Sequence, residues 1–400
     1  MSVSLDLKSK SLDLVIQPTV GLLNMQRTVG DLNDVAIPYW RGAPGIGKTA
    51  FCGLFVTNYN MLVMETHFGQ TPIEEVSGLP NFYDLTVNGQ IMKGTQWTLP
   101  EVLTQLYQLA DTATVDASGR KQTVVWLLDD FHLAPPSMMA LGFEMFTKHK
   151  LRGVPLPDNV AFLLAGNMSA KAGSKKNLLS AVANRCVIMP VHGDFDYWKT
   201  KFAIPVGINS KVIAFLSHTK YSSYFQEEEQ LENPWASARS WTKFANLLSG
   251  MESGMDEISH SDLLYYCSGH VGTEAASEFT SYYKLYAKVE TAKIFDGLLA
   301  IEVPKEFGNQ YIFAIANVNE FINRFKKAKT EERGPIIKIM ADIIIEIAMV
   351  KSQIAVTAMK DIILLEKSLK LRNVYSRIKG VISTQNPEIN SKLEDDIHEL

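Results

Sequence analysis

Residues 42–49 read Gly42-Ala43-Pro44-Gly45-Ile46-Gly47-Lys48-Thr49, which fits the phosphate-binding pattern G-x-x-x-x-G-K-[ST]. A strand-like apolar run at 36–40 precedes this stretch, and apolar residues at helical spacing follow it. In such a loop, backbone N–H groups surround the phosphates, Lys48 contacts the β and γ oxygens, and the Thr49 hydroxyl is a ligand of Mg²⁺. The sequence therefore predicts a nucleotide-binding protein.

The composition is that of a globular chain of moderate charge. Its 400 residues correspond to about two to three domains, and 46% of them are hydrophobic, enough for a sizeable core. The 43 acidic and 39 basic residues give a pI of about 6.1, so no global attraction to nucleic acid or anionic membranes is expected. The three cysteines, Cys52, Cys186 and Cys267, lie far apart, which argues against a disulfide framework or a Cys₄ metal site and fits a reducing compartment.

The sequence predicts no membrane span and no export signal. Its first residues lack the long apolar core of a signal peptide. The isoleucine-rich run at 336–365 is interrupted by charged residues too often for a transmembrane helix, so we expect an amphipathic helix or helix pair. A cytoplasmic location is expected, which would be the host cytoplasm if a virus encodes the chain.

Short apolar runs bounded by polar residues are typical of strands buried on both faces of a parallel sheet. The sequence has five such runs, with helical patterns between most of them, at 36–40, 61–64, 124–128, 160–165 and 186–191. Within 81–94, the pair Asn88-Gly89 predicts a β-hairpin with a type I′ turn. The following Thr98-Leu99-Pro100-Glu101 predicts a helix that begins with a capping box at Thr98.

Beyond about Lys199 the strand-like runs stop and helical patterns take over, at 212–216, 238–248, 261–266 and 273–289. The expected fold is thus a five-stranded parallel α/β sheet with helices on both faces, followed by helical regions. The predicted division is a segment 1–34, an α/β nucleotide-binding domain 35–199, helical regions 200–301 and 302–380, and a charged, flexible tail 381–400.

Polar residues follow two of the predicted strands. The run 124–128 ends in Asp129 and Asp130; in an enzyme with a phosphate-binding loop, the first carboxylate can hold Mg²⁺ through water and the second can deprotonate the attacking water. Asn167 follows 160–165 and could hydrogen-bond the attacking water or the γ-phosphate, the alternative being a plain turn or helix cap. Arg185 ends a predicted helix at the edge of the domain, where it could face a neighbouring subunit's γ-phosphate.

In order and spacing, these residues resemble the AAA+ ATPases, specifically the MoxR-like branch, from about Val35 to Phe279. The matching stretches are 42–49, 127–136, 157–159 with 165–167, Arg185, 233–241 and 272–279. The resemblance implies an ATPase that binds ATP and Mg²⁺, with 42–49 as Walker A and Asp129 and Asp130 as Walker B. It also implies that Asn167 is sensor 1, Arg185 an arginine finger and Arg239 sensor 2, with 200–301 as the helical lid.

The same resemblance implies a quaternary structure and partners. The family members form rings, which predicts a homo-oligomer, hexameric by family precedent, with a pore-facing insertion at 81–94 that acts on a protein client. MoxR-like proteins commonly work with a partner that carries a von Willebrand factor A domain. This chain departs from the family at Asp130, where Walker B normally has glutamate, and at His132, where asparagine is common; we expect His132 to be a local hydrogen-bonding residue and not a metal ligand.

Two other functions remain open on the sequence. A nucleic-acid motor or loader would need basic pore residues, for which Lys93, Lys171, Lys175 and Lys176 are candidates without an interleaved aromatic platform. A nucleotide-gated structural ring with little hydrolysis is suggested by Asp130 in place of glutamate.

Overall fold

The computed structural model divides the chain into two compact units, Met1–Asp194 and Phe195–Leu400, which are described separately. The predicted boundary near Lys199 lies a few residues away from this division. The structure describes residues 10–28, 34–167, 180–218, 221–225, 233–255, 257–369 and 371–398.

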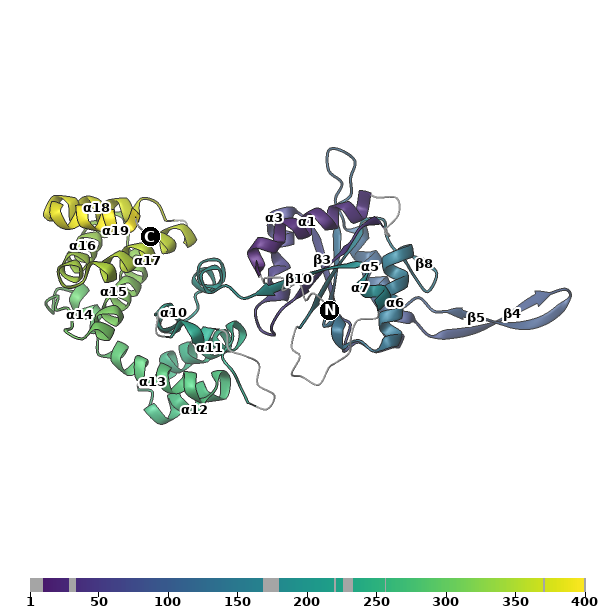
Figure 1. Cartoon of the computed structure of the whole chain (residues 1–400), viewed down its shortest axis with the longest axis horizontal. Helices are drawn as coiled ribbons and strands as arrows, with labels where there is room; N and C mark the ends of the chain where they lie inside the picture. Colours follow the sequence, from purple (N-terminus) through teal and green to yellow (C-terminus); the bar gives the residue numbers. More distant parts are fainter. Residues whose placement is uncertain are drawn as a thin grey trace, which may run out of the picture. The chain divides into compact units, whose positions relative to one another are not determined.

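The first unit is built on one parallel sheet that lies between two layers of helices (Figure 1). Its strands, in spatial order, are β1 (Lys10–Ser11), β10 (Cys186–His192), β2 (Ile37–Arg41), β9 (Val160–Gly166), β6 (Val124–Asp129) and β3 (Leu62–His67). The predicted α/β fold class is confirmed. The predicted number of strands is wrong, since the described sheet has six and β1 is only two residues long, too short for a detectable apolar pattern.

Successive side chains of the central strand β6 point to opposite faces of the sheet and pack into two separate core layers. Val125 and Leu127 pack into the layer that contains α1 (Leu12–Thr28) and α3 (Gly53–Tyr59). Val124, Trp126 and Leu128 pack into the opposite layer, together with α5 (Glu101–Asp111) and α6 (Pro136–Lys148). Because every β6 side chain is buried, the strand reads as one continuous apolar run in the sequence.

Helix α1 is tied to the sheet by the buried side chain of Gln26. Its Nε2 donates to the Phe162 carbonyl (3.0 Å), and its Oε1 accepts from the Phe162 N–H (2.7 Å). The amide therefore pairs with the β9 backbone as a neighbouring strand residue would. Trp40 adds a second link, since its Nε1 donates to the Thr19 hydroxyl of α1 (2.9 Å).

Gln26→Leu is expected to destabilise the first unit by about 2 kcal/mol, because it leaves the buried Phe162 N–H and carbonyl without partners while nearly conserving volume. Urea unfolding measures the change. Asn24→Ala, on the exposed face of the same helix, is the matched control and should shift the transition by less than about 0.5 kcal/mol. Equal stability of Gln26→Leu and the wild type would contradict this role.

The predicted hairpin is confirmed, and it is longer than expected. Strands β4 (Pro80–Val87) and β5 (Gln90–Trp97) pair antiparallel around Asn88 and Gly89, which both have the positive φ of a type I′ turn, 51° and 80°. Figure 1 shows the hairpin extending away from the body of the first unit.

The capping box predicted at Thr98 is wrong. Helix α5 begins at Glu101, after Pro100, without a side-chain cap. The Thr98 hydroxyl instead accepts a hydrogen bond from the Leu79 N–H (2.8 Å), and Leu79 accepts one from the Thr98 N–H at its carbonyl (2.8 Å). Thr98 thus closes the base of the hairpin, a long-range contact that competes with the local cap.

The second unit is helical in all of its described residues that form regular structure. Its helices of eight or more residues are α10 (Ser210–Ser217), α11 (Ala238–Gly254), α12 (His260–Val271), α13 (Thr273–Ala287), α15 (Phe307–Lys327), α16 (Arg333–Val350), α17 (Ser352–Ser368), α18 (Val374–Gln385) and α19 (Pro387–His398). The isoleucine-rich run forms the predicted helix pair, α16 and α17. One continuous core joins residues from both predicted helical regions, 200–301 and 302–380.

The interpretation of 381–400 as a flexible tail is wrong for its described part. Helix α18 continues to Gln385, and α19 occupies Pro387–His398. Ile382 and Leu393 are buried in the core of the second unit. The high charge of this segment belongs to an amphipathic helix with one apolar face, which composition alone does not distinguish from a tail.

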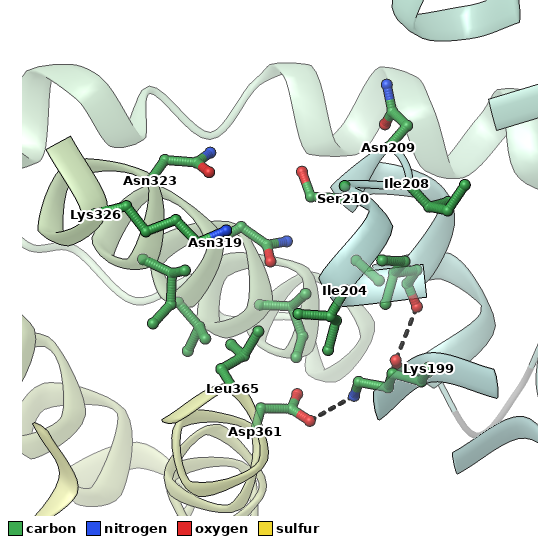
Figure 2. A pocket seen from close by; sticks show the side chains of 17 residues that line it. Lys199, Ile204, Ile208, Asn209, Ser210, Asn319, Asn323, Lys326, Asp361 and Leu365 are labelled. Atoms are coloured by element: carbon green, nitrogen blue, oxygen red, sulfur yellow. Dashed lines mark hydrogen bonds and ion pairs between the residues drawn. The ribbon is translucent and has the colours of Figure 1, made fainter. Parts of the chain in front are cut away.

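A buried ion pair lies at a cavity of about 190 Å³ within the second unit (Figure 2). Lys199, in the π-helical turn η3 (Trp198–Ala203), donates from Nζ to Asp361 Oδ1 of α17 at 2.6 Å. Both side chains are almost fully buried. The pair links the start of the second unit to its C-terminal helices, and loss of one partner would leave a buried charge uncompensated.

Candidate active site

Three chain segments meet at the carboxyl edge of the parallel sheet. The glycine-rich loop 42–49 follows β2, Asp129 ends β6, and Asn167 follows β9. Strand β9 lies between β2 and β6, so Asn167 emerges between the loop and the acidic pair. Clefts at this edge are the usual ligand sites of open parallel sheets.

Lys48 is the centre of the hydrogen-bond network in the loop. Its buried Nζ donates to the carbonyls of Gly42 (3.1 Å) and Ala43 (3.0 Å) and to Asn167 Oδ1 (3.0 Å). Gly47 has a φ of 95°, which favours glycine, and a Cβ on Gly42 would lie 2.4 Å from the Val191 carbonyl oxygen. The lysine ammonium is thus held where phosphate oxygens could replace carbonyl oxygens as its acceptors.

The side chains of Thr49 and Asp129 lie next to each other at the site. The Thr49 hydroxyl donates to Asp129 Oδ2 (2.8 Å), and Asp129 Oδ1 accepts from the Asp130 N–H (2.8 Å). Asp129 is buried, with 8% of its surface exposed. A hydroxyl and a carboxylate are hard oxygen donors, so the residues present fit Mg²⁺ bound together with nucleotide phosphates.

Asp130 lies in a left-handed turn directly after β6. Its φ is 51°, a conformation that aspartate adopts more readily than most residues, and it precedes the short helix η2 (Phe131–Leu133). The side chain is half-buried.

His132 contacts the residue predicted as a sensor, which confirms it as a local hydrogen-bonding residue. The Asn167 N–H donates to His132 Nδ1 over 3.4 Å. Burial lowers the pKa of His132, and the positive charges of Lys48 and Arg41 add to this effect, while the negative charges of Asp130 and Asp129 oppose it. The lowered pKa favours the neutral ring, which can accept this hydrogen bond. A Cβ on Gly166 would lie 2.9 Å from Nδ1 and 2.5 Å from the Tyr39 hydroxyl, which fixes glycine before Asn167.

The two predicted arginines make their described contacts outside this network. Arg185 follows the one-turn helix α7 (Ser180–Ala183); its Nη1 donates to the Ala181 carbonyl (2.7 Å), and its guanidinium lies 4.3 Å from the centre of the Phe143 ring. Arg239 belongs to the second unit, where it is exposed in the first turn of α11. The predicted roles of both residues therefore depend on a neighbouring subunit or on the placement of the second unit.

Two residues at this edge were missed by sequence reasoning. Glu65 and His67, near the end of β3, lie beside Asp129, and one ligand atom of each of the three residues lies within 4.8 Å of the others. Burial raises the pKa of Glu65, as do the charges of Asp129 and Asp130, while His67 opposes the shift. The signal available in the sequence was the group of three polar residues, Glu65, Thr66 and His67, that directly follows the apolar run 61–64.

The basic residues of the nucleic-acid hypothesis form no cluster within the described residues. Lys93 pairs with Asp84 across the hairpin at 2.5 Å. Lys171, Lys175 and Lys176 lie outside the described residues.

Over the described part of the chain, no helix is both long and apolar enough to cross a membrane.

The three cysteines are free thiols, of which Cys52 and Cys267 are buried. Burial raises the pKa of each thiol, to about 12 for Cys186, so none of them is a reactive thiolate at neutral pH.

No protein-family model and no curated protein matches the sequence. Among solved structures, similarity is found to a point mutant of Thermotoga maritima RuvB, with 11% identity and a TM-score of 0.35 over 72% of this chain and 80% of that chain. The T. maritima RuvB Holliday junction branch migration motor gives 13% identity and a TM-score of 0.30, over 73% and 79%. NtrX from Brucella abortus gives 12% and 0.31, over 92% and 69%.

Proposed function

We propose that this chain is a ring-forming AAA+ ATPase of the MoxR-like type, which couples ATP binding and hydrolysis to the remodelling of a protein complex. One observation carries the proposal: Thr49 contacts Asp129 at 2.8 Å while Lys48 contacts Asn167 at 3.0 Å. Polar residues from two other strands, Asp129 of β6 and Asn167 after β9, thus meet the glycine-rich loop, an arrangement that suits transfer of a phosphoryl group to water.

The residues divide the chemistry between binding and proton transfer. Backbone N–H groups of 42–49 and the Lys48 ammonium would hold the ATP phosphates. Thr49 and Asp129 would hold Mg²⁺, which neutralises charge on the β and γ oxygens when bound. Asp130 would accept the proton of the attacking water, and Asn167 would orient that water or the γ-phosphate.

Assembly and partners follow from the same proposal. Arg185 would stabilise transition-state charge at a neighbour's nucleotide, and Arg239 would act as sensor 2 from the helical lid. The ring is proposed to be a hexamer. Its partner would be a protein client or a protein with a von Willebrand factor A domain, and the hairpin 80–97 would face the client.

The test measures the rate of ATP hydrolysis together with the molecular mass of the assembly. The wild-type chain should release phosphate from Mg²⁺–ATP, and light scattering should report a larger assembly with ATP than without it. Lys48→Ala is the matched negative control, because it removes the ammonium that contacts the phosphates and should abolish nucleotide binding. A wild-type chain that neither binds nor hydrolyses ATP would overturn the proposal.

The hairpin gives a prediction specific to client action. Its apolar side chains are exposed, with 69% of Phe82 and 77% of Ile91 accessible, and Leu85 and Met92 are exposed as a cross-strand pair on the other face. Shortening 86–92 is expected to leave basal ATP hydrolysis and assembly intact, because these residues lie outside both core layers.

Client-dependent function should be lost in the same variant and can be measured by stimulation of ATP hydrolysis by the client or by co-purification with it. A double substitution of the turn, Asn88→Asp with Gly89→Asn, keeps type I′ geometry accessible and serves as the control. Loss of folding in the shortened chain would mark the hairpin as structural and contradict the pore assignment.

A further inference from the structure

The carboxyl end of β3 contributes two metal-ligating side chains that the ATPase chemistry leaves unused. We propose that Glu65, His67 and Asp129 form a binding site for a first-row transition-metal ion, such as Mn²⁺ or Zn²⁺, that is filled without nucleotide. This inference rests on the proposed function only in sharing Asp129, which the nucleotide-bound Mg²⁺ would also contact.

Strand pairing places the three side chains together. Strands β3 and β6 are parallel neighbours, and their register sets His67 directly opposite Asp129. Glu65 precedes His67 by two residues, so both side chains leave the same face of the strand. His67 Nε2 lies 3.4 Å from Glu65 Oε1, and one ligand atom from each of the three residues lies within 4.8 Å of the others. Neighbouring ligands of one ion, with bonds of about 2.0–2.2 Å, lie about 3 to 3.5 Å apart. The Glu65–His67 pair already has this separation, and the Asp129 oxygen lies within 4.8 Å of both, a distance that a side-chain rotation can shorten.

The distribution of charge favours a bound cation. Glu65 and Asp129 bring two carboxylates to this edge, and Asp130 follows Asp129 directly in the chain. The described hydrogen bonds of Asp129 come from neutral groups, the Thr49 hydroxyl and the Asp130 N–H, which leave its negative charge in place. Glu65 and His67 are exposed and Asp129 is buried. Two carboxylates at this spacing repel, and a divalent ion reverses that repulsion.

The ligand types select the metal. Mg²⁺ is bound through oxygen and keeps much of its water, whereas an imidazole nitrogen suits Mn²⁺, Co²⁺ or Zn²⁺ better. A site with one nitrogen and two carboxylates should therefore discriminate against Mg²⁺. It also differs from the proposed Mg²⁺–ATP site because all of its ligands come from the protein, so binding needs no phosphate.

The experiment is calorimetric titration of the full-length protein with MnCl₂ and, separately, MgCl₂, in the absence of nucleotide. The wild-type chain should bind one Mn²⁺ per subunit. His67→Ala and Glu65→Gln should each weaken Mn²⁺ binding by at least about tenfold. The wild-type chain should bind Mg²⁺ only weakly. His67→Ala should leave this weak binding unchanged, because Mg²⁺ binding does not depend on the imidazole. Glu74→Gln, an acidic residue of the separate helix α4 (Ile73–Ser77), is the matched control and should bind Mn²⁺ like the wild type.

Lys48→Ala separates this inference from the ATPase proposal. It should lose ATP binding and keep Mn²⁺ binding, since Lys48 supplies no metal ligand. Absence of Mn²⁺ binding in the wild-type chain would overturn the site even if ATP is hydrolysed. Mn²⁺ binding that falls in Asp129→Asn but is unchanged in both His67→Ala and Glu65→Gln would also overturn it. Circular dichroism identifies any variant that fails to fold, and His67→Gln then replaces His67→Ala.

Discussion

Arg185→Ala is expected to hydrolyse ATP about a thousandfold more slowly than the wild-type chain, because an arginine supplied in trans typically contributes that much or more to phosphoryl transfer. Within its own subunit, the Arg185 guanidinium stacks on Phe143 and donates to the Ala181 carbonyl. These contacts hold it against α6 and α7, and its proposed γ-phosphate is that of a neighbouring subunit. Phosphate release under saturating Mg²⁺–ATP measures the effect, and ATP affinity should change far less than turnover.

Mixing two inactive variants tests whether the site is shared. Asp130→Asn subunits have a disabled site and an intact Arg185, so an Arg185→Ala site that borders one of them is complete again. A mixture should therefore regain part of the lost hydrolysis, whereas each variant alone stays inactive. Arg185→Lys keeps the charge without the planar fork and should recover only part of the rate. Wild-type activity of Arg185→Ala as a diluted monomer would contradict a shared site.

The central part of the first unit could be predicted from the sequence because its strands are buried on both faces. A strand such as β6, with every side chain buried, gives an unbroken apolar run that no surface helix shows. The same reasoning missed β1, whose two residues carry no periodicity, and it missed the role of α1, whose Gln26 pairs with a backbone far away in sequence. Long-range pairing of this kind leaves no local signal.

The errors outside the sheet have a common cause. The Thr98 capping box and the flexible tail were both inferred from local composition, and in both places a tertiary contact decides the structure. Thr98 bonds Leu79 across the base of the hairpin, and Leu393 of α19 is buried in the core of the second unit. A charged segment forms an ordered helix here because one apolar side of it, which includes Leu393, packs against that core.

In the candidate site, too, some contacts could be predicted from the sequence and others could not. That Lys48, Thr49, Asp129 and Asn167 meet could be predicted, because loops at the carboxyl ends of adjacent parallel strands share one edge. Glu65 and His67 lie beside Asp129 because of the register between β3 and β6, and this register could not be predicted from the sequence. The roles of Arg185 and Arg239 remain predictions, since they depend on a neighbouring subunit and on the placement of the lid.

Asp130→Asn is expected to keep ATP bound and to reduce hydrolysis by at least about a hundredfold, the usual contribution of a positioned general base. The amide has nearly the shape of the carboxylate and cannot accept the proton of the attacking water. Its backbone stays in the left-handed turn at φ 51°, which asparagine tolerates as well as aspartate, so the fold should be unchanged.

Two measurements on the same protein separate binding from chemistry. Equilibrium titration with ATP should give an affinity close to that of the wild type, while phosphate release under saturating ATP falls. Asp130→Glu is the matched variant, since it keeps a carboxylate and reaches one methylene further from the turn, and it should retain hydrolysis at or above the wild-type rate. If Asp130→Asn instead turns over ATP at the wild-type rate, the base is another residue, and the left-handed turn after β6 has to be explained by its packing alone.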